Sequence, residues 1–160
     1  MALRVAVVTV SDSVSAGQRE DLSGPAVRER CAALGWQVAS THVVSDDPAM
    51  IQVRLRELAD SGELDVVLTA GGTGVGPRDS TPEATIAACE KLVPGLGELM
   101  RQKGQQAAPR AMLSRAAAGI RGRTLIVNLP GSPRGAVESL DAVAELIPHA
   151  VEVLHGARHE

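Results

Sequence analysis

Three aspartates stand close behind apolar, β-branched segments of this sequence. Asp12 follows LRVAVVTV, Asp46 follows WQVASTHVV, and Asp79 lies behind a glycine-rich turn that follows LDVVLTA. The chain's single asparagine, Asn128, lies near the end of a fourth such segment, TLIVNLP. Turns are where Asp, Asn and Gly ordinarily belong, so each residue alone says little. Because ligands of open parallel sheets bind outside the carboxyl ends of the strands, the coincidence of four strand ends predicts one shared site.

The turn at residues 71–77, GGTGVGP, matches neither of two well-known phosphate-binding motifs. A dinucleotide-binding fingerprint that began at Gly72 would need a sixth-position glycine where Pro77 stands. A Walker A motif would need Lys after Gly76, where the sequence has Pro77 and Arg78. What remains is a loop of small residues that exposes backbone N–H groups and leads into a helix start. This arrangement favours an anion, and a phosphate is the natural ligand.

Asp79 suggests that a cation takes part in phosphate binding. A carboxylate beside a phosphate-binding loop repels its ligand unless a cation intervenes, and Mg²⁺ bridges carboxylate and phosphate oxygens well. Asp46, from a neighbouring strand end, is the candidate for a second ligand. The alternative for either aspartate is structural, namely a helix cap or an ion pair with Arg78 or another arginine.

Residues 80–83, STPE, predict the start of a helix. Either Ser80 is the N-cap and Glu83 closes a capping box, or Thr81 is the N-cap and Pro82 takes the first helical position. Both versions explain these residues without any role in chemistry.

The elements that would position these groups alternate along the chain. We expect strands over residues 3–10, 36–44, 64–70 and 124–130, and helices from about residues 23, 48 and 80 and over about 95–118 and 134–155. Such alternation predicts an α/β fold with a mainly parallel sheet that helices cover on both faces. A length of 160 residues fits one domain, residues 1–160.

Composition excludes several classes of function. The chain has no Phe, no Tyr and a single tryptophan, Trp36, which argues against nucleic-acid binding by base stacking. A net charge of −3 argues against a polyanionic partner. Cys31 and Cys89 are isolated and predict reduced core thiols rather than a zinc site or a disulfide framework. With no signal peptide and no membrane-length apolar run, we expect a cytoplasmic protein without a membrane or nucleic-acid partner.

Four longer strings carry a resemblance to a known family: TVSD at 9–12, GGTGVGPRDSTPEAT at 71–85, LSR at 113–115 and NLPGSP at 128–133. The chain resembles the MogA/MoaB-type molybdenum cofactor biosynthesis proteins, the molybdopterin adenylyltransferase family, over nearly its whole length. The resemblance implies a three-layer α/β/α fold that assembles as a trimer or a hexamer. Active members adenylate molybdopterin with Mg-ATP and release pyrophosphate, which prepares the pterin for a molybdenum-insertion enzyme.

The resemblance also implies which residues form the site. By motif position, Asp79 corresponds to the family's essential aspartate and Asp46 to the second acidic residue. The implied substrate-binding residues are Ser11, Asp12, Gly71, Gly72, Thr73, Gly74, Ser114, Arg115, Asn128, Pro130, Gly131 and Ser132. We hypothesise that Asp46 and Asp79 hold Mg²⁺ on the triphosphate. The group expected to locate the pterin and its phosphate is Thr73, Ser114, Arg115 and the turn at residues 128–131.

Two other functions stay open at this point. The family includes members that do not adenylate, and the chain's short length resembles the MoaB-type branch, so a molybdopterin-binding or carrier protein is the main alternative. A trimeric scaffold with a vestigial pocket is the third. Release of pyrophosphate in the presence of molybdopterin and ATP separates the enzyme from both.

Overall fold

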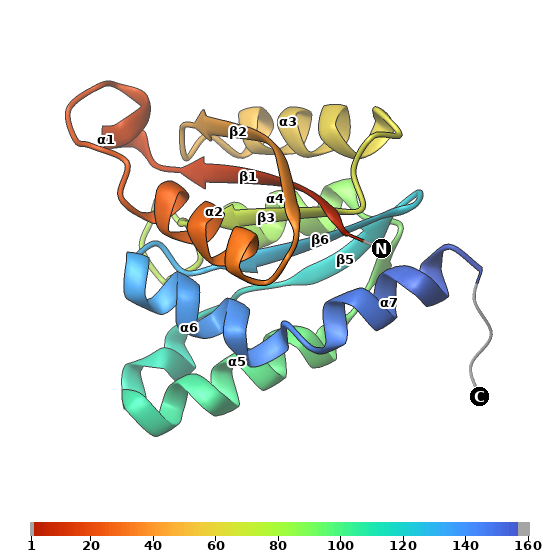
Figure 1. The fold of residues 1–160 in the computed structure, drawn as a ribbon. Coiled ribbons are helices and arrows are strands. Elements are labelled where there is room, and N and C mark those ends of the chain that lie inside the picture. The colour runs from red at the N-terminus through yellow and green to blue at the C-terminus, as the bar shows by residue number, and fades with distance from the viewer. Residues whose placement is uncertain (1, 157–160) are drawn as a thin grey trace.

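The fold is built on one six-stranded sheet, seen in a computed structural model that describes residues 2–156 (Figure 1). The strands are β1 Arg4–Val10, β2 Gln37–Val44, β3 Val66–Ala70, β4 Lys91–Leu92, β5 Ala118–Arg121 and β6 Thr124–Leu129. Their order in the sheet is β2-β1-β3-β6-β5-β4. β1, β2, β3 and β6 run parallel, whereas β5 runs antiparallel to both β6 and β4. The expected α/β fold with a mainly parallel sheet is confirmed.

Helices cover both faces of this sheet and make three layers (Figure 1). Their bounds are α1 Asp12–Ser15, α2 Ser23–Ala33, α3 Pro48–Asp60, α4 Thr81–Ala88, α5 Pro94–Ala107, α6 Pro133–Val143 and α7 Leu146–Leu154, with a 3₁₀ helix, η1, at Pro109–Leu113. One buried core lies between the sheet and α2, α5, α6 and α7, and a second lies between the sheet and α3 and α4. The pleat divides β1 between them: Val5 and Val7 face the first core, and Val8 faces the second.

Two parts of the expected layout were wrong. Residues 118–129 form a β5–β6 hairpin where the sequence indicated one strand, because the short AGIR segment lacks a long apolar run. The helical segments at 95–118 and 134–155 each divide in two, and residues 114–117 are not helical. The turn of helix at α1 was also missed, since the three polar residues that follow the strand, Ser11, Asp12 and Ser13, are typical of a loop.

The two cysteines are free thiols, as expected. Cys31 is fully buried in the first core and Cys89 packs against the second. Burial raises the pKa of each thiol to about 11, so both stay protonated at neutral pH. Among the described residues, no helix has both the length and the apolar character needed to cross a membrane.

Candidate active site

The register of the parallel strands brings their carboxyl ends to one edge. Val10 pairs with Val44, and Ala70 pairs with Leu129, so the next residue of each chain segment emerges at the same level. Backbone hydrogen bonds continue past the strands, from Ser11 N–H to the Val44 carbonyl and from Gly71 N–H to the Leu129 carbonyl. The loops predicted to form the site therefore meet because strand pairing fixes where each one begins.

Two glycines set the path of the loop behind β3. Gly71 and Gly72 have φ values of +112° and +69°, which side chains rarely adopt. A Cβ on Gly71 would lie 2.2 Å from the Val10 carbonyl oxygen, and one on Gly72 would lie 2.3 Å from the Thr81 hydroxyl. The Thr81 hydroxyl donates to the Gly71 carbonyl oxygen at 2.9 Å. The loop is thus packed against β1 on one side and the start of α4 on the other.

Asp12 and Asp46 hold each other's backbone. The N–H of Asp12 donates to Asp46 Oδ2 and the N–H of Asp46 donates to Asp12 Oδ1, both at 2.9 Å. Arg78 adds a bidentate contact to Asp12, with two 3.0 Å hydrogen bonds. The ion pair with Arg78, which was the structural alternative for Asp46 and Asp79, is therefore made by Asp12. The helix cap, the other alternative, is provided by Asp47 at the start of α3.

The electrostatics differ between these carboxylates. The pKa of Asp46 lies above its ordinary value, because burial penalises the charged form and the like charges of Asp12 and Asp79 add to this effect. The pKa of Asp12 is lowered, chiefly by the hydrogen bond from Arg78. A cation placed beside Asp46 would relieve the crowding of negative charge.

The donor set near Asp46 suits a cation that arrives with its phosphates. Asp46 Oδ1 and Asp79 Oδ1 accept no hydrogen bond from the described residues, whereas each Oδ2 accepts a backbone N–H. No group of three or more His, Cys, Asp or Glu side chains in residues 2–156 is arranged to hold a metal. Mg²⁺ is usually bound by one or two carboxylates together with substrate phosphates and water, so two free carboxylate oxygens fit it.

Neither version of the capping box forms at the start of α4. Ser80 is the N-cap residue, but its hydroxyl donates to the Asp46 carbonyl oxygen at 3.0 Å instead of capping the helix. Glu83 pairs with Arg115, and Thr81 faces the glycine loop. The local cap does not form because Ser80, Thr81 and Glu83 each bond to a group outside the helix start.

Asp79 is held by the loop that precedes it. Its Oδ2 accepts the N–H of Gly76 at 2.9 Å, and a Cβ on Gly74 or Gly76 would lie 2.9 Å from the same oxygen. The small residues of this loop therefore provide space for the carboxylate as well as N–H groups for an anion.

Arg115 makes four side-chain hydrogen bonds, two to the glycine-loop segment and two to α4. It donates to the carbonyl oxygens of Gly74 and Asp79 at 2.8 and 2.9 Å, and two further bonds reach the Glu83 carboxylate. Its own N–H donates to the Thr73 carbonyl oxygen at 2.8 Å. We expected Arg115 to locate the pterin phosphate, but these contacts leave a single guanidinium N–H for a ligand, so its observed part is to hold the loop.

Replacing Arg115 with Gln should destabilise the protein by about 2 kcal/mol, because several charge-assisted hydrogen bonds to the loop are lost at a half-exposed position. Urea unfolding measures the change. Glu83→Gln is the matched control, since it removes the ion pair but leaves both loop carbonyl bonds of Arg115, and it should cost less than half as much. Equal losses in the two variants would contradict a role for the carbonyl contacts.

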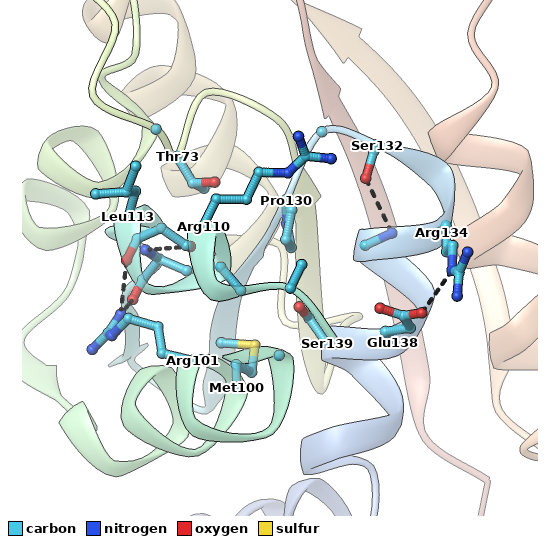
Figure 2. A pocket seen from close by; sticks show the side chains of 18 of the residues that line it. Thr73, Met100, Arg101, Arg110, Leu113, Pro130, Ser132, Arg134, Glu138 and Ser139 are labelled. Carbon is cyan, nitrogen blue, oxygen red and sulfur yellow. Dashed lines mark hydrogen bonds and ion pairs between the residues drawn. The ribbon is translucent and has the colours of Figure 1, made fainter. Parts of the chain in front are cut away.

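A cavity of about 1080 Å³ opens next to the glycine loop (Figure 2). Its walls come from that loop, the turn after β6, and the facing surfaces of α5, η1 and α6. Eight of the predicted site residues line it: Gly72, Thr73, Gly74, Asp79, Ser114, Pro130, Gly131 and Ser132. The other six predicted residues, Ser11, Asp12, Asp46, Gly71, Arg115 and Asn128, do not line this cavity.

Comparison with known proteins identifies the family. A family model described as a probable molybdopterin binding domain matches residues 6–149. The chain belongs to this molybdopterin-binding family. A molybdopterin adenylyltransferase of Helicobacter pylori is 42% identical over 156 residues, 96% of this chain and 89% of the relative. The molybdopterin adenylyltransferase of Escherichia coli K12 is 35% identical over 96% of this chain and 86% of its own length.

Solved structures of the molybdopterin-binding family share the fold. The molybdopterin biosynthesis enzyme MoaB of Thermus thermophilus superposes with a TM-score of 0.91 at 50% identity, over 99% of both chains. The tungsten cofactor synthesizing protein MoaB of Pyrococcus furiosus gives 0.85 at 34% identity, over 96% of this chain and 97% of its own. The three-layer fold expected from the resemblance is confirmed.

Asn128 is one of the predicted site residues that do not line the cavity. Asn128 is fully buried, and its amide donates to the hydroxyls of Thr69 and Thr85 while its Oδ1 accepts the N–H of Ala117. The contact of Asn128 with the pterin stays a prediction, and these hydrogen bonds do not support it. Asn128 links β3, α4 and the segment before β5, which is a structural part in this molybdopterin-binding fold.

Ser11 caps a helix, which its motif did not reveal. Its hydroxyl accepts the N–H of Val14 at 3.2 Å and so stabilises the start of α1. Ser11 is next to Asp12 in the chain and does not line the cavity.

No motif in the sequence pointed to the cationic residues of the cavity. Arg101, Lys103, Arg110 and Arg134 all line it, and none of them belongs to the motifs that resemble the family. Arg110 lies on η1, within a segment expected to be plain helix. Its nearness in sequence to the LSR string at 113–115 was the one available hint.

Proposed function

We propose that this protein is a molybdopterin adenylyltransferase of molybdenum cofactor biosynthesis, which joins the phosphate of molybdopterin to the α-phosphate of ATP and releases pyrophosphate. The observation that carries the proposal is that the carboxylates of Asp46 and Asp79, the glycine loop and a large cavity all lie at one edge of the sheet. Relatives named molybdopterin adenylyltransferase match almost the whole chain.

The chemistry demands that two polyanions approach each other. A phosphate oxygen of the pterin attacks the α-phosphorus of ATP, and the bond to the pyrophosphate oxygen breaks, so negative charge has to be positioned and neutralised. Asp46 and Asp79 would hold Mg²⁺, which would supply charge neutralisation on the triphosphate. The protein's own part is to fix those carboxylates through the loop contacts and to present the loop N–H groups to phosphate oxygens.

The cavity is large enough for the organic part of a substrate. Its volume of about 1080 Å³ lies at the upper end of ordinary ligand pockets. No aromatic side chain lines it, so a pterin ring would rest on aliphatic groups such as Val75, Met100 and Leu113. This agrees with a chain in which the single tryptophan, Trp36, is buried in the first core.

Direct measurement of pyrophosphate release tests the proposal. Purified protein with molybdopterin, ATP and Mg²⁺ should release pyrophosphate and form adenylated molybdopterin, and omission of any one component should stop the reaction. Tight molybdopterin binding without pyrophosphate release would overturn the proposal and assign the carrier function instead. A ligand at 100 times its dissociation constant adds about 2.7 kcal/mol to stability, so an unchanged melting temperature would indicate a vestigial pocket.

We extend the proposal to the cellular setting. The trimer or hexamer, the molybdenum-insertion enzyme as the next partner and the cytoplasmic location stay predictions. Sedimentation of the purified protein measures the first of these.

A further inference from the structure

The cations that line the cavity differ in how far they are engaged. Arg101 donates to the carbonyl oxygens of Ser114 and Ala116 at 3.4 and 3.1 Å. Arg134 pairs with Glu138 at 2.9 Å. The side chains of Arg110 and Lys103 make no hydrogen bond or ion pair with any of residues 2–156, and the Arg110 side chain extends from η1 toward the side of the cavity where Ser132 lies (Figure 2). A guanidinium free of protein partners is available for a ligand.

Thr73 adds a hydroxyl to the wall of the cavity. Only 5% of its residue surface is exposed, yet its hydroxyl makes no hydrogen bond with the part of the chain that the structure describes. The hydroxyl points into the cavity (Figure 2). Among the described residues, every fully buried side-chain N or O atom has a hydrogen-bond partner, so the unpaired Thr73 hydroxyl is open to the cavity and is placed to bind something that enters it.

Carboxylates and a free guanidinium lie at different places around the glycine loop. Asp12 and Asp46 lie outside the cavity and Asp79 lines it, so a metal-bound triphosphate is suited to the edge of the cavity near these carboxylates. Arg110 and the Thr73 hydroxyl face into the cavity itself. A phosphate monoester that carries no metal needs cationic and hydrogen-bonding groups, and a guanidinium binds it with two parallel N–H bonds.

We propose that Arg110, together with the Thr73 hydroxyl, binds the phosphate monoester of the pterin substrate and so determines which side of the loop each substrate occupies. This inference rests on the proposed function, because it takes molybdopterin as the ligand. Arg115, which shares a short segment with Arg110, is instead a positioning residue that acts through the loop. Asp79 lines the same cavity, so a phosphate at Arg110 lies in the compartment that also reaches the metal-binding side.

Direct binding of molybdopterin, kept under anaerobic conditions, tests the assignment without relying on turnover. Calorimetry should show that Arg110→Gln raises the dissociation constant for molybdopterin roughly 10- to 100-fold, the loss expected for a charge-assisted hydrogen-bonding group. The dissociation constant for Mg-ATP should change less than about twofold. Arg110→Lys keeps the charge but loses the planar fork, so it should fall between wild type and Arg110→Gln.

A phosphate-free pterin makes the test specific to the proposed contact. Against dephosphorylated molybdopterin, wild type and Arg110→Gln should bind alike, because the group that Arg110 contacts is missing. Lys103→Gln removes another cation from the cavity lining and should weaken binding less than Arg110→Gln does. Arg123→Gln, an exposed site in the turn between β5 and β6, should behave as wild type.

Each contrary outcome has a clear meaning. A rise in the Mg-ATP constant with molybdopterin binding unchanged would overturn the assignment, and so would equal losses for Arg110→Gln and Lys103→Gln. An equal loss against the phosphate-free pterin would also overturn it. If wild type binds molybdopterin but releases no pyrophosphate, the proposed function fails while the binding series still tests Arg110. If wild type binds no molybdopterin, both are overturned.

Discussion

Asp79→Asn should lower the turnover of molybdopterin adenylation by roughly 100-fold or more while the protein stays folded. Asn keeps an oxygen that can accept the Gly76 N–H, so the loop contact at 2.9 Å survives. What disappears is the negative charge that would hold Mg²⁺ on the triphosphate. Steady-state rates of pyrophosphate release at saturating substrates measure the effect, and circular dichroism with thermal melting checks the fold.

Asp47→Asn is the matched control for this change. Asp47 also lies at the sheet edge, but its carboxylate caps α3 by accepting the N–H of Ala49, and Asn caps helices equally well. The variant loses the same charge away from the glycine loop and should keep its turnover within about twofold. Near-normal adenylation by Asp79→Asn would remove Asp79 from the mechanism.

Gly71→Ala should lower the free energy of unfolding by about 3 kcal/mol or more, the largest stability loss that we expect from one added methyl group in this chain. The added Cβ would lie 2.2 Å from the Val10 carbonyl oxygen, which is backbone and cannot rotate away. The φ of +112° adds strain of its own. Urea unfolding of the purified variant measures the loss.

Gly62→Ala is the control that separates the strain of a positive φ from the steric clash of the added Cβ. Gly62 also has a positive φ, +74°, but no atom lies within 4 Å of its added Cβ. That variant should lose only about 1 kcal/mol, the usual penalty for a side chain in the left-handed region. Similar losses for both variants would mean that the contact with Val10 does not decide the cost at Gly71.

The position of the site could be predicted because it follows from local rules. The apolar segments define strands, and Asp12, Asp46 and Asp79 each follow one of them. Parallel strands bring their carboxyl ends to one edge of the sheet. The glycine loop at 71–77 could likewise be recognised, since small residues before a helix start expose N–H groups. These features depend on residues near one another in sequence.

The partners of individual side chains could not be predicted in the same way. Asn128 looked like a ligand-binding residue, yet Thr69 and Thr85 surround its amide in the core. Glu83 looked like half of a capping box, yet Arg115, 32 positions away, binds it. In each case the sequence allows several polar partners for the side chain, and the packing of distant segments determines which of them it contacts.

By itself, the sequence determined the α/β class, the edge of the sheet that carries the site, and the family motifs within it. The tertiary structure alone decided that Arg115 holds the loop, that Asn128 stays inside, and that Arg110 has no partner among the described residues at the cavity. The physical reason is that strand and loop conformation depend on short-range sterics and hydrophobic periodicity, whereas hydrogen-bond partners depend on which distant segments meet. The presence of Asp79 and Arg110 in one cavity arises from that meeting.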